Sequence, residues 1–152
     1  MKNKNYKTLI LTVIICLLPM VLGGVLYNKL PDQMPIHFTI NDQPDNYAPK
    51  EVALFGIPVL MAIVQTICIL FIMKTQKKEE NKPKIIKIFE WFIPIITVLL
   101  YIIMIEVPLG STVYIGKSVC LILGTLLIII GNYTPKVSYE TRKRIIPPTS
   151  KE

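Results

Sequence analysis

The sequence has few of the residue types that most catalytic and metal sites need. It contains one histidine and three cysteines in 152 residues. Cys16, Cys68 and Cys120 all lie inside apolar runs, so their spacing fits neither a disulfide framework nor a metal site, and we interpret them as small hydrophobic residues. A glycine-rich phosphate loop, a zinc-binding helix, a serine elbow and a cysteine–histidine pair are all missing. The sequence therefore predicts a protein that is not an enzyme and has no cofactor.

Acidic residues are also scarce, with ten against seventeen basic residues and a net charge of +7. A nucleic-acid-binding protein would gather its basic residues on one polar surface, whereas here they occupy short segments between apolar runs. The chain is 52% hydrophobic, with a mean hydropathy of +0.52, which is too apolar for an ordinary soluble domain. These features exclude a nucleic-acid partner and indicate the lipid bilayer instead.

Four apolar stretches are long enough to cross a bilayer, because about twenty helical residues span a hydrocarbon core of roughly 30 Å. We therefore predict an all-α integral membrane protein with four transmembrane helices. The first helix is expected to stay uncleaved and to be kinked by Pro19. The last two helices should form an antiparallel hairpin, because only a short turn separates them. The predicted helices are 8–27, 52–73, 85–109 and 113–131.

The basic residues predict how the chain is oriented. Fourteen of the seventeen lie in the N-terminal arm, in the loop 74–87 or in the tail 132–152, and only Lys29, Lys50 and Lys117 lie in the segments between these. The positive-inside rule then places both termini in the cytoplasm and the loop 28–51 outside. The predicted organisation is an N-terminal domain (1–73), a basic cytoplasmic loop (74–87), a helical hairpin (85–131) and a basic cytoplasmic tail (132–152).

The outer loop has the composition of a shaped element. Pro31 and Pro35 restrict the backbone and disfavour helix in the residues before them. Residues 36–40 alternate apolar and polar side chains, which predicts a short strand with Ile36, Phe38 and Ile40 on one face. Residues 41–44 have turn chemistry, because Asn and Asp tolerate the left-handed region. We therefore expect a strand and turn between the first two helices.

The loop also contains His37, the one histidine of the chain. Together with Asp32, Asp42 and Asp45 it could hold a divalent cation on the outer face. A lone histidine without a second nitrogen or sulfur ligand makes a weak metal site. The other interpretation is that these residues cap turns and face solvent.

Two polar residues interrupt the apolar stretches. Gln65 is a candidate for a hydrogen bond between helices, which contributes about 0.6 kcal/mol on average. Glu90 lies about one turn inside its stretch, beside Trp91. An aromatic belt at the membrane interface would explain the pair, whereas a deeper acid would indicate function, because its burial is costly.

The run LPDQMPIHFTINDQPDNYAPK resembles the LPxxIPxHxxxxGxxD pattern of a domain of unknown function at the N-terminus of SdpI-type bacterial membrane proteins. The similarity covers roughly residues 8–73. The chain departs from the pattern at the turn, where Asp42 stands in place of the common glycine. The matching positions are Leu30, Pro31, Asp32, Pro35, His37, Asp45, Lys50 and Pro58.

A second similarity lies near the C-terminus. Residues 131–136, GNYTPK, are similar to the start of the C-terminal signature of the same proteins. The GIRTPW-type motif that normally follows is replaced by VSYETR at residues 137–142.

The resemblance implies a function, because SdpI-type proteins protect the producing bacterium from a secreted killing peptide and hold a repressor at the membrane. It implies an immunity protein of the bacterial cell membrane whose outer-loop motif binds a secreted peptide toxin. Two alternatives stay open: a sensor whose basic loop 74–87 binds a cytoplasmic regulator, and a small-solute transporter that uses Gln65, Glu90, Glu106 or His37. The residues of the candidate binding motif are Pro31, Asp32, Pro35, His37 and Asp45.

Overall fold

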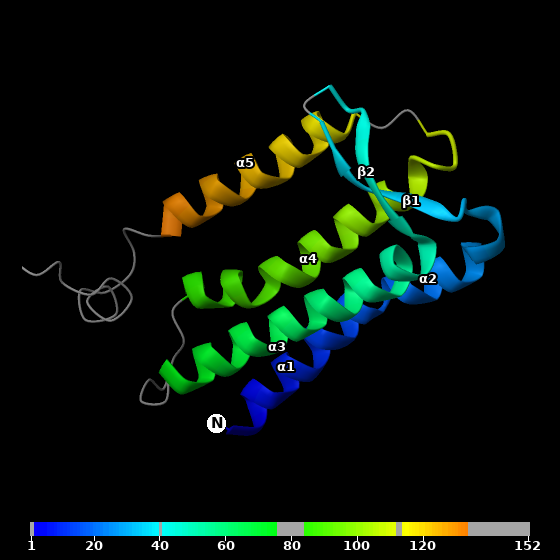
Figure 1. Cartoon of the computed structure of the whole chain (residues 1–152). Coiled ribbons are helices and arrows are strands. Elements are labelled where there is room, and N and C mark those ends of the chain that lie inside the picture. Colours follow the sequence, from blue (N-terminus) through cyan, green and yellow to red (C-terminus); the bar gives the residue numbers. More distant parts are fainter. Residues whose placement is uncertain (1, 40, 76–83, 112–113, 134–152) are drawn as a thin grey trace, which may run out of the picture.

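Four helical spans and a small β-hairpin make up the fold (Figure 1). A computed structural model describes residues 2–39, 41–75, 84–111 and 114–133. The β-hairpin lies at one end of the helices, here called the hairpin end, and α1 begins and α3 ends at the opposite end (Figure 1). The four spans are long and apolar enough to cross a membrane, which confirms the prediction of a helical, multi-pass membrane protein: Tyr6–Lys29, Val52–Lys74, Ile85–Glu106 and Ile115–Asn132.

The helices differ in detail from the predicted ranges. The first span is interrupted at Leu18, because Pro19 has no N–H to continue the hydrogen-bond ladder of the preceding helix. It begins earlier than residue 8 and ends in a 3-10 turn, and the second span opens with a π-helical turn. The elements are α1 (Lys2–Leu17), α2 (Pro19–Leu26), η1 (Tyr27–Lys29), β1 (Gln33–Phe38), β2 (Pro44–Pro49), η2 (Val52–Gly56), α3 (Ile57–Thr75), α4 (Lys84–Glu106) and α5 (Ile115–Tyr133).

Two hydrogen bonds between the second and third spans go to carbonyl groups that prolines leave without a helical donor. Pro58 cannot donate to the carbonyl of Leu54 four residues earlier, and that carbonyl accepts a hydrogen bond from the Tyr101 hydroxyl of α4 at 3.1 Å. Pro94 likewise leaves the carbonyl of Glu90 without its usual helical donor, and the Gln65 amide of α3 donates to it at 2.8 Å. The predicted interhelical bond of Gln65 is thus confirmed, and each helix supplies the donor that a proline removed from the other.

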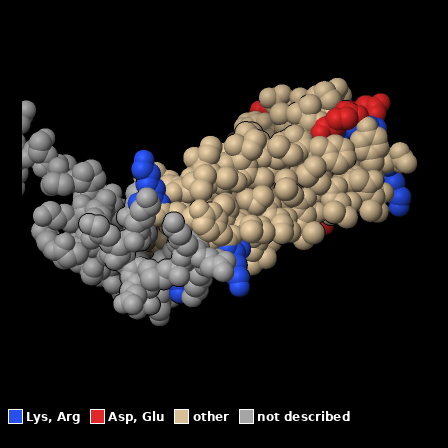
Figure 2. All heavy atoms as spheres, turned by 90° about the horizontal axis from the view of Figure 1, so that it is seen from below, with Lys and Arg blue, Asp and Glu red and all other residues tan. Residues whose placement is uncertain are grey.

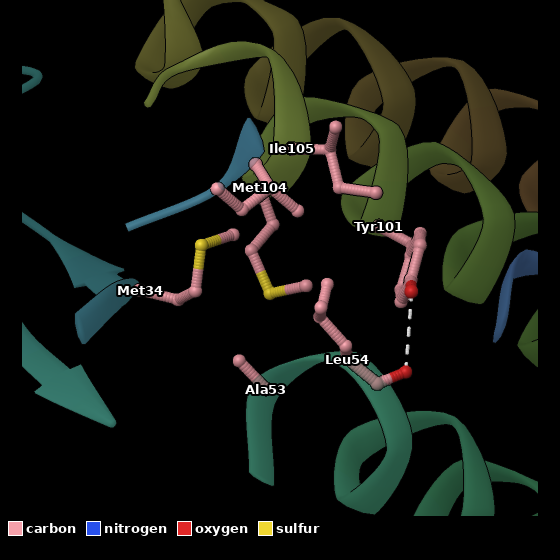
Figure 3. Packing of buried hydrophobic residues seen from close by; sticks show 7 residues of the cluster. Met34, Ala53, Leu54, Tyr101, Met104 and Ile105 are labelled. Carbon is pink, nitrogen blue, oxygen red and sulfur yellow. Dashed lines mark hydrogen bonds between the residues drawn. The ribbon is translucent and has the colours of Figure 1, made fainter. Parts of the chain in front are cut away.

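The buried core lies at the hairpin end, between β1, η2 and α4 (Figure 3). Met34, Ala53 and Leu54 are fully buried there, and the Tyr101 hydroxyl reaches the Leu54 carbonyl across the cluster (Figure 3). Gly23 of α2 permits this packing, because a Cβ at that position would lie 2.1 Å from the Tyr101 hydroxyl oxygen. The core therefore attaches the hairpin directly to the helices.

Charged side chains are sparse along the described part of the molecule. Figure 2 shows a broad uncharged face with lysines toward one end and a mixed acidic and basic patch at the hairpin end. Most of the basic loop 74–87 and of the tail 132–152 lies outside the described residues. The uncharged band is what a hydrocarbon core requires of the surface that it covers.

Candidate functional site

The candidate site is the β-hairpin together with the residues that join it to the helices. β1 and β2 pair in antiparallel fashion, with Met34 opposite Ala48 and His37 opposite Asn46. The predicted single strand over residues 36–40 was therefore wrong in extent. The first strand begins three residues earlier, at Gln33, and a second strand, which was not predicted, follows the turn. Residue 40 lies outside the described residues.

The predicted alternation of β1 fails at Ile36. The register shifts on both sides of His37, between it and Pro35 and between it and Phe38, so Ile36 has no partner on β2. Ile36 is 39% exposed, and the side chain that enters the core is Met34. A β-bulge of this kind inserts an extra residue and re-aims its neighbours, which period-two reasoning cannot detect.

Each strand has one proline at a position whose backbone nitrogen faces away from the partner strand. The Lys50 N–H donates to the Asp32 carbonyl at 2.9 Å, so this pair and Met34–Ala48 are the hydrogen-bonded pairs of the antiparallel ladder. Pro35 and Pro49 fall at the alternate positions, where an N–H would point away from the partner strand. Neither proline can offer a donor there, and the outward Tyr47 N–H donates to the Asn46 side chain at 2.9 Å, so few donors are left to pair with a further strand.

The base of the hairpin is joined to the helices by a chain of polar contacts. Lys50 forms an ion pair with Asp32 at 2.9 Å, and its ammonium group lies 4.4 Å from the centroid of the Tyr27 ring. The Tyr27 hydroxyl donates a hydrogen bond to the Glu51 carboxylate. The bond from Lys50 holds the pKa of Asp32 below its ordinary value and raises the pKa of Lys50, and the Tyr27 hydroxyl lowers the pKa of Glu51. The charged forms are therefore favoured in the folded hairpin.

The turn of the hairpin is tied to the start of α5. Asp42 has a φ of 60°, so it adopts the left-handed conformation for which the related pattern uses glycine. Its carboxylate accepts a hydrogen bond from the Gly116 N–H at 2.5 Å. This amide is one of the unsatisfied donors in the first turn of α5, and the negative charge also suits the helix dipole. Sequence reasoning missed this contact, since the two residues are far apart in the chain.

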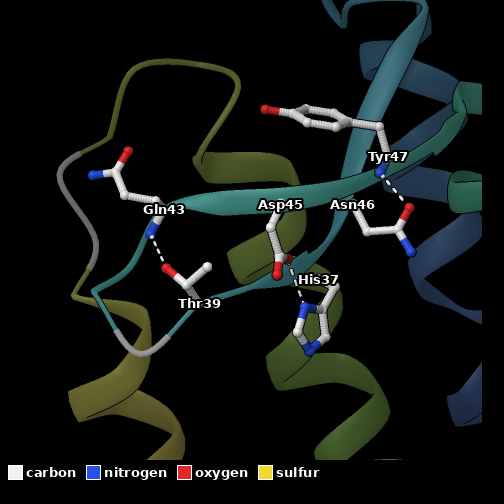
Figure 4. Close-up of polar contacts among 6 residues, drawn as sticks. All are labelled: His37, Thr39, Gln43, Asp45, Asn46 and Tyr47. Atoms are coloured by element: carbon white, nitrogen blue, oxygen red, sulfur yellow. Dashed lines mark hydrogen bonds and ion pairs between the residues drawn. The ribbon is translucent and has the colours of Figure 1, made fainter.

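His37 and Asp45 meet on the exposed surface of the hairpin. The Nδ1 atom of His37 lies 2.6 Å from Oδ1 of Asp45, and the two side chains are 67% and 43% exposed (Figure 4). The Tyr47 ring, half exposed, projects away from His37 (Figure 4). The aspartate orients the imidazole and leaves its Nε2 atom at the surface, where it can exchange a hydrogen bond with a ligand.

The structure brings only some of the predicted site residues together. Pro31 is exposed at the start of the hairpin and Pro35 is buried. The three acids contact different partners. Asp45 pairs with His37, Asp32 pairs with Lys50, and Asp42 binds the start of α5. The described residues contain no group of three His, Cys, Asp or Glu side chains that could hold a metal ion. The divalent-cation interpretation of His37 therefore has no support from the geometry.

Gln65 and Glu90 lie together, but away from the hairpin and between the helices. Gln65 is fully buried and Glu90 is 4% exposed. The interfacial interpretation of Glu90 was incomplete, because the residue packs inside the bundle while Trp91 beside it is 36% exposed. The signal that could have predicted this position is Pro94, whose missing N–H requires a donor near Glu90.

Comparison with known proteins gives one similarity. Residues 14–62 match a family described as a domain of unknown function, DUF1648. No curated protein and no solved structure matches the chain. The matched segment runs from α1 into α3 and includes the whole β-hairpin and its polar attachment. The chain is thus similar to this domain family over the part that builds the candidate site.

Proposed function

We propose that this protein is a non-enzymatic immunity protein of a bacterial cell membrane, which binds a secreted toxic peptide through its β-hairpin. The proposal places the hairpin outside the cell and both termini in the cytoplasm. It is supported by the four apolar spans, by the basic residues that the sequence gathers in its N-terminal arm, its segment 74–87 and its tail 132–152, and by the likeness of the hairpin sequence to SdpI-type proteins.

The observation that carries the proposal is a polar hairpin, attached to the helices at several points, at one end of four apolar spans. Met34 and Ala48 anchor its base in the core, Lys50 links it to Tyr27 of the first span, and Asp42 attaches its turn to α5. Binding to a pre-organised surface loses less conformational entropy than binding to a mobile loop. A loop that served only to connect two helices would not need three separate attachments.

The chemistry of the hairpin favours recognition by side chains. Pro35 and Pro49 limit the addition of a peptide strand at its edges. The exposed groups are the His37–Asp45 pair, which can exchange hydrogen bonds, and Tyr47, which offers an aromatic surface with a hydroxyl group. Aromatic side chains beside polar groups are common at sites of peptide recognition. We therefore assign the His37–Asp45 pair as the main contact residues, and Tyr47, whose ring projects away from His37, as a separate contact for a peptide that lies along the hairpin.

Peptide sensitivity of bacteria tests this function. A strain that lacks the gene should become sensitive to a secreted peptide encoded near it, and the intact gene should restore protection. His37→Ala and Asp45→Ala should each weaken protection by about ten-fold or more, the effect of losing roughly 1.4 kcal/mol of binding. Gln33→Ala is the matched control, because Gln33 is also exposed on β1 but lies away from the pair.

Two results would contradict the proposal. Unchanged sensitivity of the deletion strain to every peptide of the neighbouring loci would remove the immunity function, and co-purification of a soluble DNA-binding protein would then favour the regulatory alternative. Full protection by both hairpin variants, at membrane levels equal to the wild type, would show that the hairpin is not the recognition element.

A further inference from the structure

An apolar groove separates α4 from α5. Its volume is about 590 Å³, and it is lined from Lys87 to Leu99 on α4 and from Leu121 to Ile129 on α5. α5 packs little against the other helices: 6% of its apolar window is buried, against 22–33% for the other three spans. It is held at its first turn, where Ile115 is buried and Asp42 binds Gly116, and the groove lies beyond this attachment.

The length of the groove fits one leaflet of a bilayer. The twelve residue steps from Lys87 to Leu99 correspond to about 18 Å of helix, slightly more than half of a hydrocarbon core of roughly 30 Å. A transmembrane helix of a second copy would need an apolar groove along the full span. An acyl chain needs only the depth of its own leaflet.

The charge at one end of the groove indicates which lipid headgroup fits. Lys87 is the only charged residue among those that line the groove, and it lies near the start of α4, where the groove meets the membrane surface. Trp91 lies one turn further along α4, the depth at which tryptophan prefers the headgroup region. A lysine at this level pairs with a lipid phosphate and contributes about 1 kcal/mol toward anionic lipids.

We propose that the groove between α4 and α5 binds an anionic phospholipid of the leaflet in which α4 begins. One acyl chain lies between the helices, and the negative headgroup binds Lys87. The lipid fills the space that side chains leave open and holds α5 against the rest of the bundle. This site is separate from the hairpin, and its test does not depend on the proposed immunity function.

Trp91 provides a direct probe, because it is the only tryptophan in the sequence and it lines the groove. The full-length protein is reconstituted in phosphatidylcholine vesicles that contain increasing fractions of phosphatidylglycerol with brominated acyl chains, and quenching of the Trp91 fluorescence is measured. Brominated phosphatidylcholine gives the reference for ordinary surrounding lipid. We expect half-maximal quenching by the anionic lipid at about a five-fold lower mole fraction, which corresponds to about 1 kcal/mol.

Three variants locate the site. Lys87→Gln should remove the preference for phosphatidylglycerol, whereas Lys74→Gln, an exposed lysine of α3 at the same end, should keep it. Thr125→Phe fills the groove from α5 and should reduce quenching by both lipids. Equal quenching by the two lipids in the wild type would overturn the proposal. Anionic quenching that both lysine variants leave unchanged would also overturn it, as would quenching that falls with protein density because a second copy occupies the groove.

Discussion

The hydroxyl group of Tyr101 satisfies a carbonyl that Pro58 leaves without a helical donor. Tyr101→Phe should lower the free energy of unfolding by about 1 kcal/mol, because the Leu54 carbonyl then stays buried without a partner. In a Pro58→Ala background, the restored N–H of residue 58 can donate to the Leu54 carbonyl. Tyr101→Phe should then lower the free energy of unfolding by much less. Unfolding by dodecyl sulfate in mixed micelles, followed by Trp91 fluorescence, measures both costs.

A second hydroxyl provides the control for this cycle. Thr66 donates to the Ala62 carbonyl within its own helix, independently of any proline. Thr66→Val should therefore lower the free energy of unfolding by the same amount in the wild type and in Pro58→Ala. If Tyr101→Phe also cost the same with and without Pro58, the link between the proline and the tyrosine would be wrong.

At Gly23 the structure leaves no room for a side chain. Gly23→Ala places a methyl group against the Tyr101 hydroxyl oxygen and should destabilise the protein by about 1–3 kcal/mol, the range for overpacking. Gly24→Ala is the matched control, because a Cβ there meets nothing within 4 Å. It should be neutral or slightly stabilising, since alanine favours helix. The micelle unfolding assay compares the two, and equal stability of both variants would contradict this packing.

At the scale of whole elements, Asp42 couples the hairpin to α5. Asp42→Ala removes the acceptor of the Gly116 N–H and should destabilise the start of α5 by about 0.5–2 kcal/mol. Hydrogen–deuterium exchange of the amides in the first turn of α5 should become faster. Asn41→Ala, an exposed neighbour in the same turn, serves as the control and should leave exchange unchanged. Unaltered exchange in Asp42→Ala would show that the helix start is held by other contacts.

The attachment of the hairpin should depend on pH. Lys50 lowers the folded-state pKa of Asp32, and Tyr27 lowers that of Glu51. The two carboxylates therefore stabilise the folded hairpin above their unfolded pKa values, near 4. This stabilisation is lost as the pH falls through their folded pKa values. The folded pKa of Lys50 is raised, so its contribution is lost as pH rises through that value. Protection of the hairpin amides, which is the intrinsic exchange rate at each pH divided by the observed rate, should therefore be highest between about pH 5 and 10. Asp32→Asn should flatten the acid side of this profile.

The spans were predictable from the sequence, whereas the contacts between distant segments were not. Apolar length alone indicates four helices, because a bilayer requires about twenty residues whatever their partners. The turn at Asp42 was also predictable, because Asn and Asp are among the few residues that tolerate the left-handed backbone conformation. The bulge at Ile36, the burial of Met34 and the Asp42–Gly116 bond depend on how the hairpin docks on the helices. Local patterns do not carry that information, although Pro58 and Pro94 do indicate where donors are needed.

At the scale of the whole molecule, the charge distribution predicts which end faces the cytoplasm. Fourteen of the seventeen basic residues lie in the N-terminal arm, the segment 74–87 or the tail 132–152 of the sequence. Those that the structure describes belong to the start of α1, the end of α3 and the start of α4, opposite the hairpin, so that end should stay inside. Single cysteines introduced by Gln43→Cys in the hairpin and Lys74→Cys at the end of α3, with Cys16, Cys68 and Cys120 replaced by alanine, report the two ends. A membrane-impermeant maleimide added to intact cells should label the hairpin variant. It should label the α3 variant only after the membrane is permeabilised. The reverse pattern would place the hairpin in the cytoplasm, out of reach of any secreted peptide, and would exclude the proposed immunity function.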